Sequence, residues 1–437
     1  MIRKPGPKAL SRRQGTGERP GVRRGDPERA PHIALIDPIW AGHHPMYFGQ
    51  FAAAFLDLGA RVSGFCPQPK AGAREIELAW GPAIDRWSTH PIPPAKRSLF
   101  NGRFEGDPYH TLDRWQQAAK AIADAAEESG QPIDAAYFPY LDTYLRFLPL
   151  PEVPASTIGI PWGGLYLRNH HYRDDTNPML RAARLLAKGD ALMRSSLCRG
   201  VGVLDERFAG ALESHIGNPV TPFPDVTLAG LPEQEPELVR FIREKAKGRP
   251  IVGLIGLEKR KGMLTMLDAA LQAQDGGLPT YFVFAGVFDR SEFEAGEQSR
   301  IQEIVGRIRS GEIDHIHFDP EAPRIATEPD FNALFRSFSV AWAAYLGFPG
   351  SSGTLGKAAA FEIPVIASRG ECIGQRVEQF RLGATIDEGN ASQATAAIRE
   401  LLETPAERDF EGYRRLHSPE RLRVVLGEWL EAAVPRR

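Results

Sequence analysis

Residues 32–66 read HIALIDPIWAGHHPMYFGQFAAAFLDLGARVSGFC, and this stretch decides the fold. Residues 32–37 form a short apolar run typical of a strand buried in a parallel sheet. Residues 46–58 carry apolar side chains at helical spacing, and Gly59 ends the predicted helix. Residues 61–66 predict a second strand. The stretch therefore predicts a β-α-β unit that opens a doubly wound domain.

The first half of the chain continues this alternation after one irregular segment. Residues 70–110 are rich in Pro, Gly and aromatic side chains and predict irregular structure. The predicted helices are 112–128, 180–187 and 208–215, and the predicted strands are 134–138, 157–160, 191–194 and 202–204. Residues 218–225, NPVTPFPD, contain three prolines and indicate the end of the first domain and the start of a linker.

The second half repeats the pattern. The predicted strands are 250–256, 280–286, 315–318, 340–345 and 364–368, and the predicted helices are 238–247, 263–273, 297–310, 331–337, 354–361 and 391–403. Strands that alternate with helices favour a parallel sheet with helices on both faces. We therefore expect an α/β protein with two Rossmann-like doubly wound domains, at 31–225 and 226–415, followed by a C-terminal helix at 416–437.

Composition narrows the function classes. The 437 residues hold 53 Lys and Arg against 55 Asp and Glu, a net charge of −2, so nucleic acid is not an expected partner. The three cysteines have no C-x-x-C spacing, which disfavours a disulfide framework or a zinc site and fits a reducing compartment. No apolar run approaches the ~18–20 residues of a membrane span, and the N-terminus lacks the apolar core of a secretory signal. We expect a cytoplasmic protein.

Residues 1–30 form a separate compositional zone. They hold many Arg and Lys residues, with Gly and Pro between them and almost no apolar side chains. Such a segment cannot bury enough surface to offset its ordering entropy, so we predict a disordered basic tail. One interpretation is contact with RNA or with anionic lipid, and lipid contact would attach the protein peripherally to a membrane. The other is a solvated tail without a binding role.

Residues 347–364, GFPGSSGTLGKAAAFEIP, form the strongest candidate binding motif. A predicted strand runs into a Gly/Ser loop that opens a helix, and a helix N-terminus offers free N–H groups and the positive end of a dipole. Ser351, Ser352 and Thr354 add hydroxyl donors, and Gly353 lets a ligand approach the backbone closely. The loop suits a phosphate-type anion. The alternative is a Ser/Thr cap on a helix that follows a tight turn.

Residues 256–262, GLEKRKG, form a second motif of this kind after another predicted strand. Lys259, Arg260 and Lys261 follow the carboxyl end of that strand, where ligands of open α/β sheets bind. The three side chains cannot all point the same way, so one or two of them should reach a pyrophosphate while the others are solvated. The alternative is a surface charge cluster.

In these motifs and their order, the chain resembles GT-B glycosyltransferases of families 1 and 4. Residues 256–270 resemble the family's strand, basic stretch ending in Lys-Gly, and helix, and residues 351–367 resemble its small-residue helix and Pro-Val-Ile-Ala strand. In the first domain, residues 42–45, GHHP, resemble the family's Gly-His loop, and residues 223–225, FPD, its domain junction. The resemblance covers roughly residues 32–415 and implies two domains that face each other across a cleft.

The resemblance implies an enzyme that moves a sugar from a UDP- or GDP-linked donor to a glycan, lipid-linked or small-molecule acceptor. Lys261, assisted by Lys259 or Arg260, would neutralise the donor pyrophosphate, and the Gly/Ser loop would hold phosphate oxygens. The donor-binding residues implied in this way are Lys259, Arg260, Lys261, Ser351, Ser352, Gly353, Thr354 and Lys357. Because fixed cations and N–H groups would carry the negative charge, neither a metal ion nor another cofactor is expected.

The same resemblance assigns the catalytic residues to the first domain. His43 or His44 would face the cleft, where either could hydrogen-bond the acceptor or the transferred sugar, or act as a base in an inverting reaction. The alternative for a His pair in a loop is ordinary structural hydrogen bonding. Residues 160–166, IPWGGLY, could line an acceptor pocket, because Trp and Tyr stack on sugars, or could equally be a packed loop.

The chain departs from the family pattern at the nucleotide-binding carboxylate. Lys357 stands where family 4 enzymes carry the Glu that binds the ribose, and Gly256 stands where the family has Arg. Lys357 favours an alternative function, a non-catalytic GT-B protein that binds a nucleotide or a partner protein without turnover. An unrelated NAD enzyme is disfavoured, because the loop after the first predicted strand lacks G-x-G-x-x-G.

Overall fold

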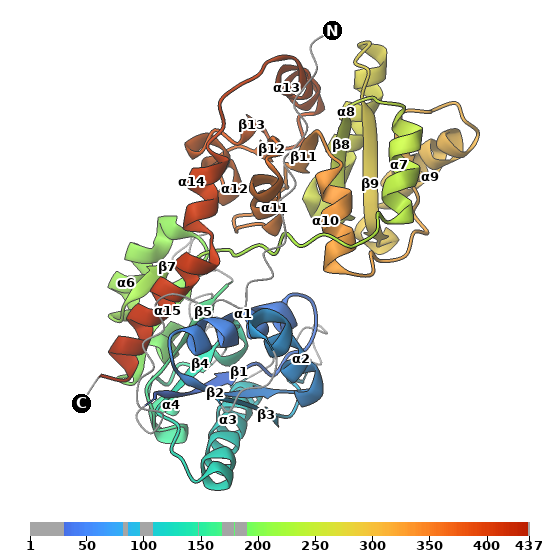
Figure 1. The fold of residues 1–437 in the computed structure, drawn as a ribbon. Coiled ribbons are helices and arrows are strands. Elements are labelled where there is room, and N and C mark those ends of the chain that lie inside the picture. Colours follow the sequence, from blue (N-terminus) through green and yellow to red (C-terminus); the bar gives the residue numbers. More distant parts are fainter. Residues whose placement is uncertain are drawn as a thin grey trace.

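The computed structural model describes residues 30–81, 86–96, 108–146, 148–167, 179 and 190–435. Figure 1 shows two lobes, each with a sheet between helices, joined by an extended linker. Nearly all of the predicted tail at 1–30, and all of the predicted helix at 180–187, lie outside the described residues.

The first lobe is built on one parallel sheet with the strand order β3-β2-β1-β4-β5-β6-β7. Its strands are β1 His32–Ile36, β2 Arg61–Cys66, β3 Trp87–Pro91, β4 Ala135–Phe138, β5 Trp162–Tyr166, β6 Cys198–Val203 and β7 Val220–Pro222. Its helices are α1 His44–Asp57, α2 Pro69–Trp80, α3 Pro108–Ser129, α4 Val153–Thr157 and α6 Ala209–Ile216. Every residue of β1 and β4 is buried, as expected for parallel strands covered on both faces.

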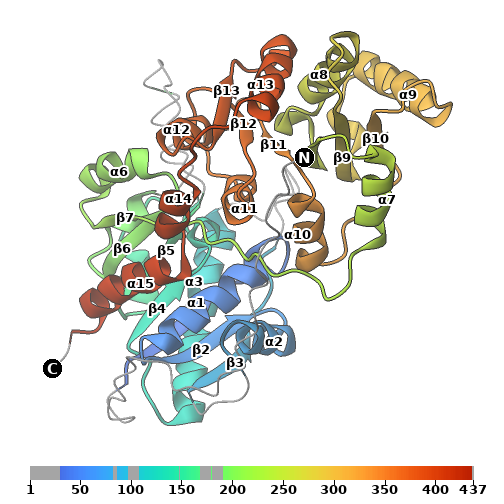
Figure 2. The ribbon, with the colours of Figure 1, turned by 45° about the horizontal axis from the view of Figure 1, so that its top comes forward.

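The second lobe has a parallel sheet with the order β10-β9-β8-β11-β12-β13 (Figure 2). Its strands are β8 Ile251–Leu257, β9 Tyr281–Phe288, β10 Ile316–Phe318, β11 Val340–Ala343, β12 Val365–Ser368 and β13 Gly383–Ile386. Its helices are α7 Glu237–Ala246, α8 Met263–Asp275, α9 Ala295–Arg309, α10 Glu328–Arg336, α11 Gly353–Phe361, α12 Cys372–Gln379 and α13 Ala391–Glu403. Two doubly wound α/β domains are therefore confirmed.

The strand order places a topological switch point in each sheet. The order reverses between β1 and β4 in the first sheet and between β8 and β11 in the second. Both pairs are parallel neighbours, so their carboxyl ends lie at the same edge of their sheet. Open α/β sheets bind ligands at this edge, beside the switch point.

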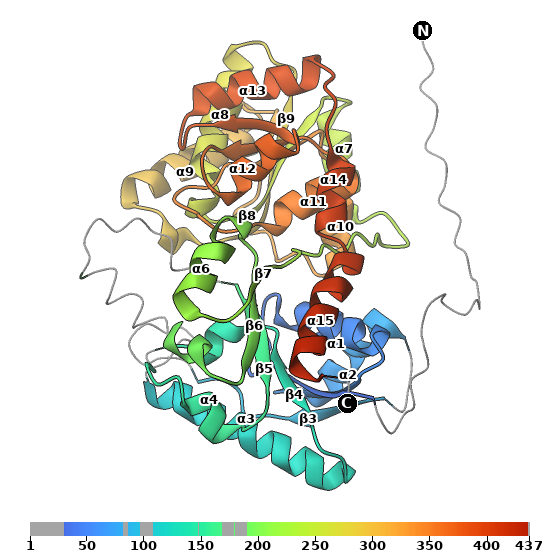
Figure 3. The ribbon, with the colours of Figure 1, turned by 90° about the vertical axis from the view of Figure 1, so that its left-hand side faces the viewer.

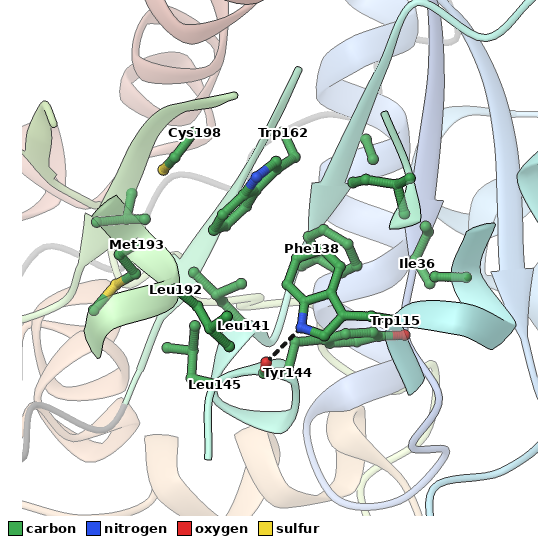
Figure 4. Close-up of a cluster of buried hydrophobic side chains, with 14 of the residues drawn as sticks. Ile36, Trp115, Phe138, Leu141, Tyr144, Leu145, Trp162, Leu192, Met193 and Cys198 are labelled. Carbon is green, nitrogen blue, oxygen red and sulfur yellow. Dashed lines mark hydrogen bonds between the residues drawn. The ribbon is translucent and has the colours of Figure 1, made fainter. Parts of the chain in front are cut away.

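Aromatic side chains fill the core below the first sheet (Figure 4). Trp115 of α3 packs against Phe138 of β4 and Trp162 of β5, with ring centroids 5.2 Å apart in each pair. Its indole nitrogen donates a hydrogen bond to the carbonyl oxygen of Tyr144 at 2.8 Å. Trp162 is fully buried in this core. The predicted acceptor pocket or loop at 160–166 is therefore wrong, because this segment is a core strand.

The C-terminal segment returns to the first lobe. Helices α14 Phe410–Leu416 and α15 Pro419–Ala433 run from the second lobe to the first, and α15 lies beside α1 (Figure 3). Trp429 of α15 packs against Tyr137 of β4 and Phe55 of α1, at centroid distances of 4.8 and 5.8 Å. The last helix therefore completes the core of the first domain. Within the described ranges, no helix combines the length and apolarity needed to cross a membrane.

Three local predictions are wrong. The segment at 70–110, predicted to be irregular, contains α2 and β3; α2 buries only Gly72 and Ile76 and so lacks a full apolar stripe. The predicted strand at 157–160 is replaced by the end of α4, and β5 begins at Trp162. The predicted strand at 191–194 is a 3-10 turn that precedes β6.

Candidate functional site

The two domains enclose a cleft of about 2270 Å³. Its wall on the first domain consists of the loop with Gly42 and His43, one side of α1 and part of α2. Its wall on the second domain includes Gly256, Lys261 and the segment 324–331, at the carboxyl edge of the sheet. The cleft therefore lies where the strand order predicts ligand binding.

Lys261 is the member of the basic motif that lines this cleft. Its ammonium group donates to the carbonyl oxygen of Ile255 at 3.2 Å and lies 3.6 Å from a carboxylate oxygen of Glu258, and 19% of its side chain is exposed. Gly256 makes room for it, because a Cβ at that position would lie 2.2 Å from Nζ of Lys261. Where the family pattern has Arg, this chain uses the space for the ammonium group of Lys261.

The other two cations of the motif are paired with protein carboxylates. Lys259 donates to the carboxylate of Glu297 on α9 at 2.7 Å. Arg260 donates to Glu258 at 2.6 Å, and its guanidinium group lies 5.2 Å from the centre of the Phe348 ring. Neither belongs to the described residues that line the cleft. Of the three adjacent cations in the basic motif, Lys261 alone is among the described residues that line the cleft.

The basic loop is held tightly against the loop that follows β11. The amide nitrogen of Leu346 donates to the carbonyl oxygen of Arg260 at 2.7 Å. Gly262 has a φ of +73°, and a Cβ there would lie 2.2 Å from the carbonyl oxygen of Ala344. Only glycine combines this backbone conformation with such a close approach. This contact fixes where Lys261 enters the cleft.

Helix α11 begins in the Gly/Ser loop. The hydroxyl of Ser352 caps the helix by accepting the amide of Thr354 at 3.2 Å, and the Tyr345 hydroxyl lies 3.0 Å from Ser352 Oγ and 2.9 Å from Thr354 Oγ1. Gly353 is exposed at the first turn. The loop lies at the same edge of the sheet as Lys261, but its residues are not among those that line the cleft. The cap interpretation is confirmed, and it leaves a helix N-terminus facing solvent.

Ser351 belongs to the domain junction. Its hydroxyl donates to Asp225 of the linker at 2.7 Å and accepts from Arg376 at 2.7 Å. Arg376 of α12 is only 2% exposed, and it also donates to Glu206, at 3.1 Å, and to the carbonyl oxygen of Leu204, both in the first domain. The hydroxyl predicted to hold a phosphate is thus already bound by protein groups that join the two domains.

Arg207 makes a second bridge from the first domain. It donates to the carbonyl oxygens of Pro349 and Gly370, each at 3.2 Å, and is paired with Asp205 at 2.7 Å. Pro349 lies within the Gly/Ser loop. The position of this loop therefore depends on both domains, and not on the second sheet alone.

Lys357, the last of the predicted donor-binding residues, lies on α11 and is buried. Its ammonium group donates to Glu328 and Asn332 of α10 and to the carbonyl oxygen of Leu228 in the linker. Glu328 lines the cleft, whereas Lys357 does not belong to its described lining. The structure therefore surrounds Lys357 with protein acceptors.

The structure also separates the two predicted histidines. His43 is exposed and lines the cleft. His44 is 8% exposed, and its ring stacks on Tyr140, which follows β4, at a centroid distance of 4.1 Å. Its Nδ1 lies 2.7 and 2.9 Å from the two carboxylate oxygens of Asp37, which follows β1. His44 thus sits at the switch point of the first sheet.

The contact between Asp37 and His44 defines how the imidazole can act. Asp37 is fully buried and accepts the amide of Ile39 at 3.0 Å; burial raises the pKa of its carboxyl group, and the hydrogen bond and charge of His44 oppose this. A carboxylate that accepts the Nδ1 proton holds a neutral imidazole in the tautomer whose Nε2 carries the lone pair. Within the described chain, Nε2 has no hydrogen-bond partner. Asp37 therefore orients the imidazole of His44 at the switch point, and His44 is not among the described residues that line the cleft.

Sequence reasoning missed three residues that shape this site: Asp37, Glu328 and Arg376. A signal existed for Asp37, since it follows the first buried strand and precedes His44 by seven positions. No local signal existed for Arg376, whose partner Glu206 is 170 positions away.

Among the described residues, one group of side chains able to bind a metal gathers at the domain junction: Asp205, Glu206 and Cys372, with ligand atoms within 4.8 Å of one another. The two carboxylates are already paired with Arg207 and Arg376. Burial raises the pKa of the Cys372 thiol to about 12, so it stays protonated at neutral pH. Ion pairing between the domains accounts for this cluster without a metal ion.

No family model matches the chain, and no curated protein matches it by sequence. Solved structures do match. Sucrose-phosphate synthase from Thermosynechococcus elongatus is similar with a TM-score of 0.58 and 18% identity, over 92% of this chain and 98% of that one. A UDP-forming α,α-trehalose-phosphate synthase from Burkholderia xenovorans is similar with a TM-score of 0.63 and 14% identity, over 93% and 100% of the two chains.

A third similar structure is Anabaena HepE in complex with UDP-glucose, with a TM-score of 0.58 and 14% identity over 92% of this chain and 99% of that one. These proteins are GT-B glycosyltransferases, and this chain has the GT-B fold. At such low identity, the likeness establishes the fold alone, and the chemistry has to be argued from the site.

Proposed function

We propose that the chain is a glycosyltransferase that moves a sugar from a UDP- or GDP-linked donor to an acceptor hydroxyl. The observation that carries the proposal is Lys261, a partly exposed cation in the cleft at the carboxyl end of β8, beside the switch point of the second sheet. The names of the similar proteins, one UDP-forming and one in complex with UDP-glucose, favour UDP.

In this proposal the second domain stabilises the leaving group. As the bond between the sugar's anomeric carbon and the β-phosphate oxygen breaks, the nucleoside diphosphate gains negative charge. Lys261 and the positive end of the α11 helix dipole would offset that charge, which is where preorganised groups lower a barrier most. Thr354, Ser352 and Gly353 border that N-terminus. Because these groups supply fixed positive charge, the proposal requires no metal ion and no further cofactor.

The first domain would supply the base. The acceptor oxygen attacks the anomeric carbon, and its proton passes to Nε2 of His44, which Asp37 orients through Nδ1. His43, exposed on the cleft wall, would hydrogen-bond the acceptor or the transferred sugar. The products are the glycosylated acceptor, the nucleoside diphosphate and a protonated His44. The acceptor class and the cytoplasmic or peripheral membrane location stay predictions from the sequence.

Calorimetric titration with UDP, GDP and ADP, followed by an assay for nucleotide release from the matching nucleotide sugars, tests this proposal. We expect one diphosphate to bind and its glucose or other hexose conjugate to be turned over, by hydrolysis if no acceptor is present. Asp37→Asn should lower kcat and leave KM for the donor nearly unchanged, because it disturbs the tautomer of His44 and not the donor site. A folded protein that binds none of the nucleotides would refute the proposal.

A second candidate is a non-catalytic GT-B protein that binds a nucleotide or a protein partner. Lys357 favours it, because a cation stands where the family pattern has a ribose-binding carboxylate. This candidate predicts nucleotide binding without turnover of any UDP- or GDP-sugar. It also predicts that Asp37→Asn changes nothing measurable in nucleotide binding or release.

A further inference from the structure

Lys357 is saturated by protein acceptors. Its ammonium group donates to Leu228 O at 3.2 Å, to Asn332 Oδ1 at 2.6 Å and to Glu328 Oε1 at 2.5 Å. An ammonium group has three N–H donors, so none remains for a phosphate. With 7% of the residue exposed, its charge is stable only because Glu328 neutralises it. Lys357 is therefore suited to holding other groups in place, and not to binding a ligand itself.

Glu328 is the group that Lys357 holds. It opens α10, lines the cleft, and has 45% of its side chain exposed. Oε1 is fixed by Lys357, while Oε2 has no hydrogen-bond partner in the described part of the chain. A carboxylate fixed at one oxygen and open at the other presents a rigid acceptor to the cleft.

We propose that Glu328 accepts hydrogen bonds from the ribose hydroxyls of the bound nucleotide, and that Lys357 is its positioning residue. The inference rests on the proposed function, because it assumes a nucleotide in this cleft. It assigns the binding carboxylate to a different helix from the one in the family pattern. The exchange of Glu for Lys at position 357 then relocates the carboxylate instead of removing it.

The chemistry of the cleft selects a vicinal diol as the ligand of Glu328. A carboxylate offers only acceptors, so it pairs with hydroxyl groups and repels phosphate oxygens. The phosphates belong with Lys261, which lines the same cleft. Pairing with Lys357 also removes the net negative charge that would otherwise disfavour a nucleoside diphosphate nearby.

Asp330 provides a matched control on the same helical turn. It also lines the cleft, but its carboxylate accepts from the hydroxyl of Thr327, the residue that caps α10, at 2.7 Å. Lys357 does not contact it within the described residues. If only the negative charge at this end of the cleft affected nucleotide affinity, substitutions at Asp330 and at Glu328 would change that affinity equally.

The test compares UDP with 2′-deoxy-UDP by calorimetry in the full chain and its variants. The unaltered protein should bind UDP about 10- to 100-fold more tightly than 2′-deoxy-UDP, the range expected for hydrogen bonds to a charged group. Glu328→Gln should weaken UDP binding more than 2′-deoxy-UDP binding, because the deoxy ligand keeps only the 3′-hydroxyl as a donor to this carboxylate. Asp330→Asn should behave as the unaltered protein, and Lys357→Met should lose most of the discrimination although Glu328 remains.

Three results would overturn the assignment. Equal affinity of the unaltered protein for UDP and 2′-deoxy-UDP would show that no group binds the 2′-hydroxyl, and so that Glu328 does not bind the ribose diol. Equal weakening of both ligands by Glu328→Gln, at an unchanged thermal unfolding midpoint, would show a general electrostatic role. Full discrimination in Lys357→Met would remove the positioning role of Lys357. Failure of the proposed function looks different, since then no nucleoside diphosphate binds at all.

Discussion

Replacing Lys261 with Ala should weaken nucleoside diphosphate binding far more than replacing Lys259, although the two cations are two positions apart. Lys261 lines the cleft, and its neighbours Ile255 O and Glu258, at 3.2 and 3.6 Å, leave it partly exposed. Lys259 instead donates to Glu297 at 2.7 Å, away from the cleft lining described here.

The magnitude follows from the kind of bond that is lost. A hydrogen bond between an ammonium group and a phosphate oxygen contributes roughly 1.5–3 kcal/mol, which is about a 10- to 150-fold change in Kd. Glu258 already compensates part of the charge of Lys261, so we expect the lower end, about tenfold. Lys259→Ala removes only a surface ion pair, which contributes little to stability, and should change Kd by less than about twofold.

Isothermal titration of UDP into both variants and the unaltered protein measures this difference. Circular dichroism on the same samples checks that each variant is folded. Equal losses at positions 259 and 261 would contradict the reasoning, because they would reflect the general field of the basic loop. An unchanged Kd in Lys261→Ala, with UDP still bound, would place the pyrophosphate elsewhere.

Three further outcomes concern the scaffold of the site. Arg376→Ala should destabilise the domain junction by roughly 1–3 kcal/mol, because the carbonyl oxygen of Leu204 and the hydroxyl of Ser351 lose a buried donor; an unchanged urea unfolding midpoint would contradict this. Burial and the nearby charge of Arg376 lower the pKa of His417 from 6.5 to about 4. The unfolded chain then binds a proton at His417 more readily than the folded chain does, so the free energy of unfolding should be highest above pH 6.5 and should fall as the pH drops towards 4. In His417→Asn the fall should be less steep. Urea titrations across this pH range would measure both slopes. Gly262→Ala should cost roughly 2 kcal/mol or more, because a Cβ meets a backbone oxygen at 2.2 Å at a φ of +73°. Gly277→Ala is the control, because Gly277 has a φ of +65° and open space around it, so this variant should show the cost of the backbone conformation alone. Equal unfolding midpoints for the two variants would contradict a steric clash at Gly262.

Much of the fold was readable from the sequence because burial leaves a local periodicity. The run at 32–37 and the helical spacing at 46–58 predicted β1 and α1, and the same alternation predicted the second sheet from β8 to β12. The prediction was wrong where an element buries little, as in α2, and it overlooked short elements of small residues such as β13. Periodicity detects a wide apolar face, and these segments have none.

The loops that form the candidate site could be predicted from the sequence, but the side chains that reach the cleft could not. Each strand-to-helix junction that carries Gly, Ser or basic residues lies at the carboxyl edge of a sheet, so the loops at 256–262 and 347–353 could be found from order alone. Which cation enters the cleft depends on the absence of a Cβ at Gly256 and on the acceptors offered by α9. These contacts depend on neighbouring elements, and the residues of the basic motif at 256–262 do not by themselves indicate them.

The sequence by itself determined two doubly wound α/β domains, the two Gly-containing loops that follow strands of the second sheet, and a His pair after the first strand, because these features depend on residues close together in the chain. Only the tertiary structure decided that Ser351 joins the domains through Arg376, that Lys357 holds Glu328, and that Asp37 orients His44. The physical reason is that a buried charge or hydroxyl is stable only beside a suitable partner. Packing of distant elements supplies that partner, and local sequence does not specify it.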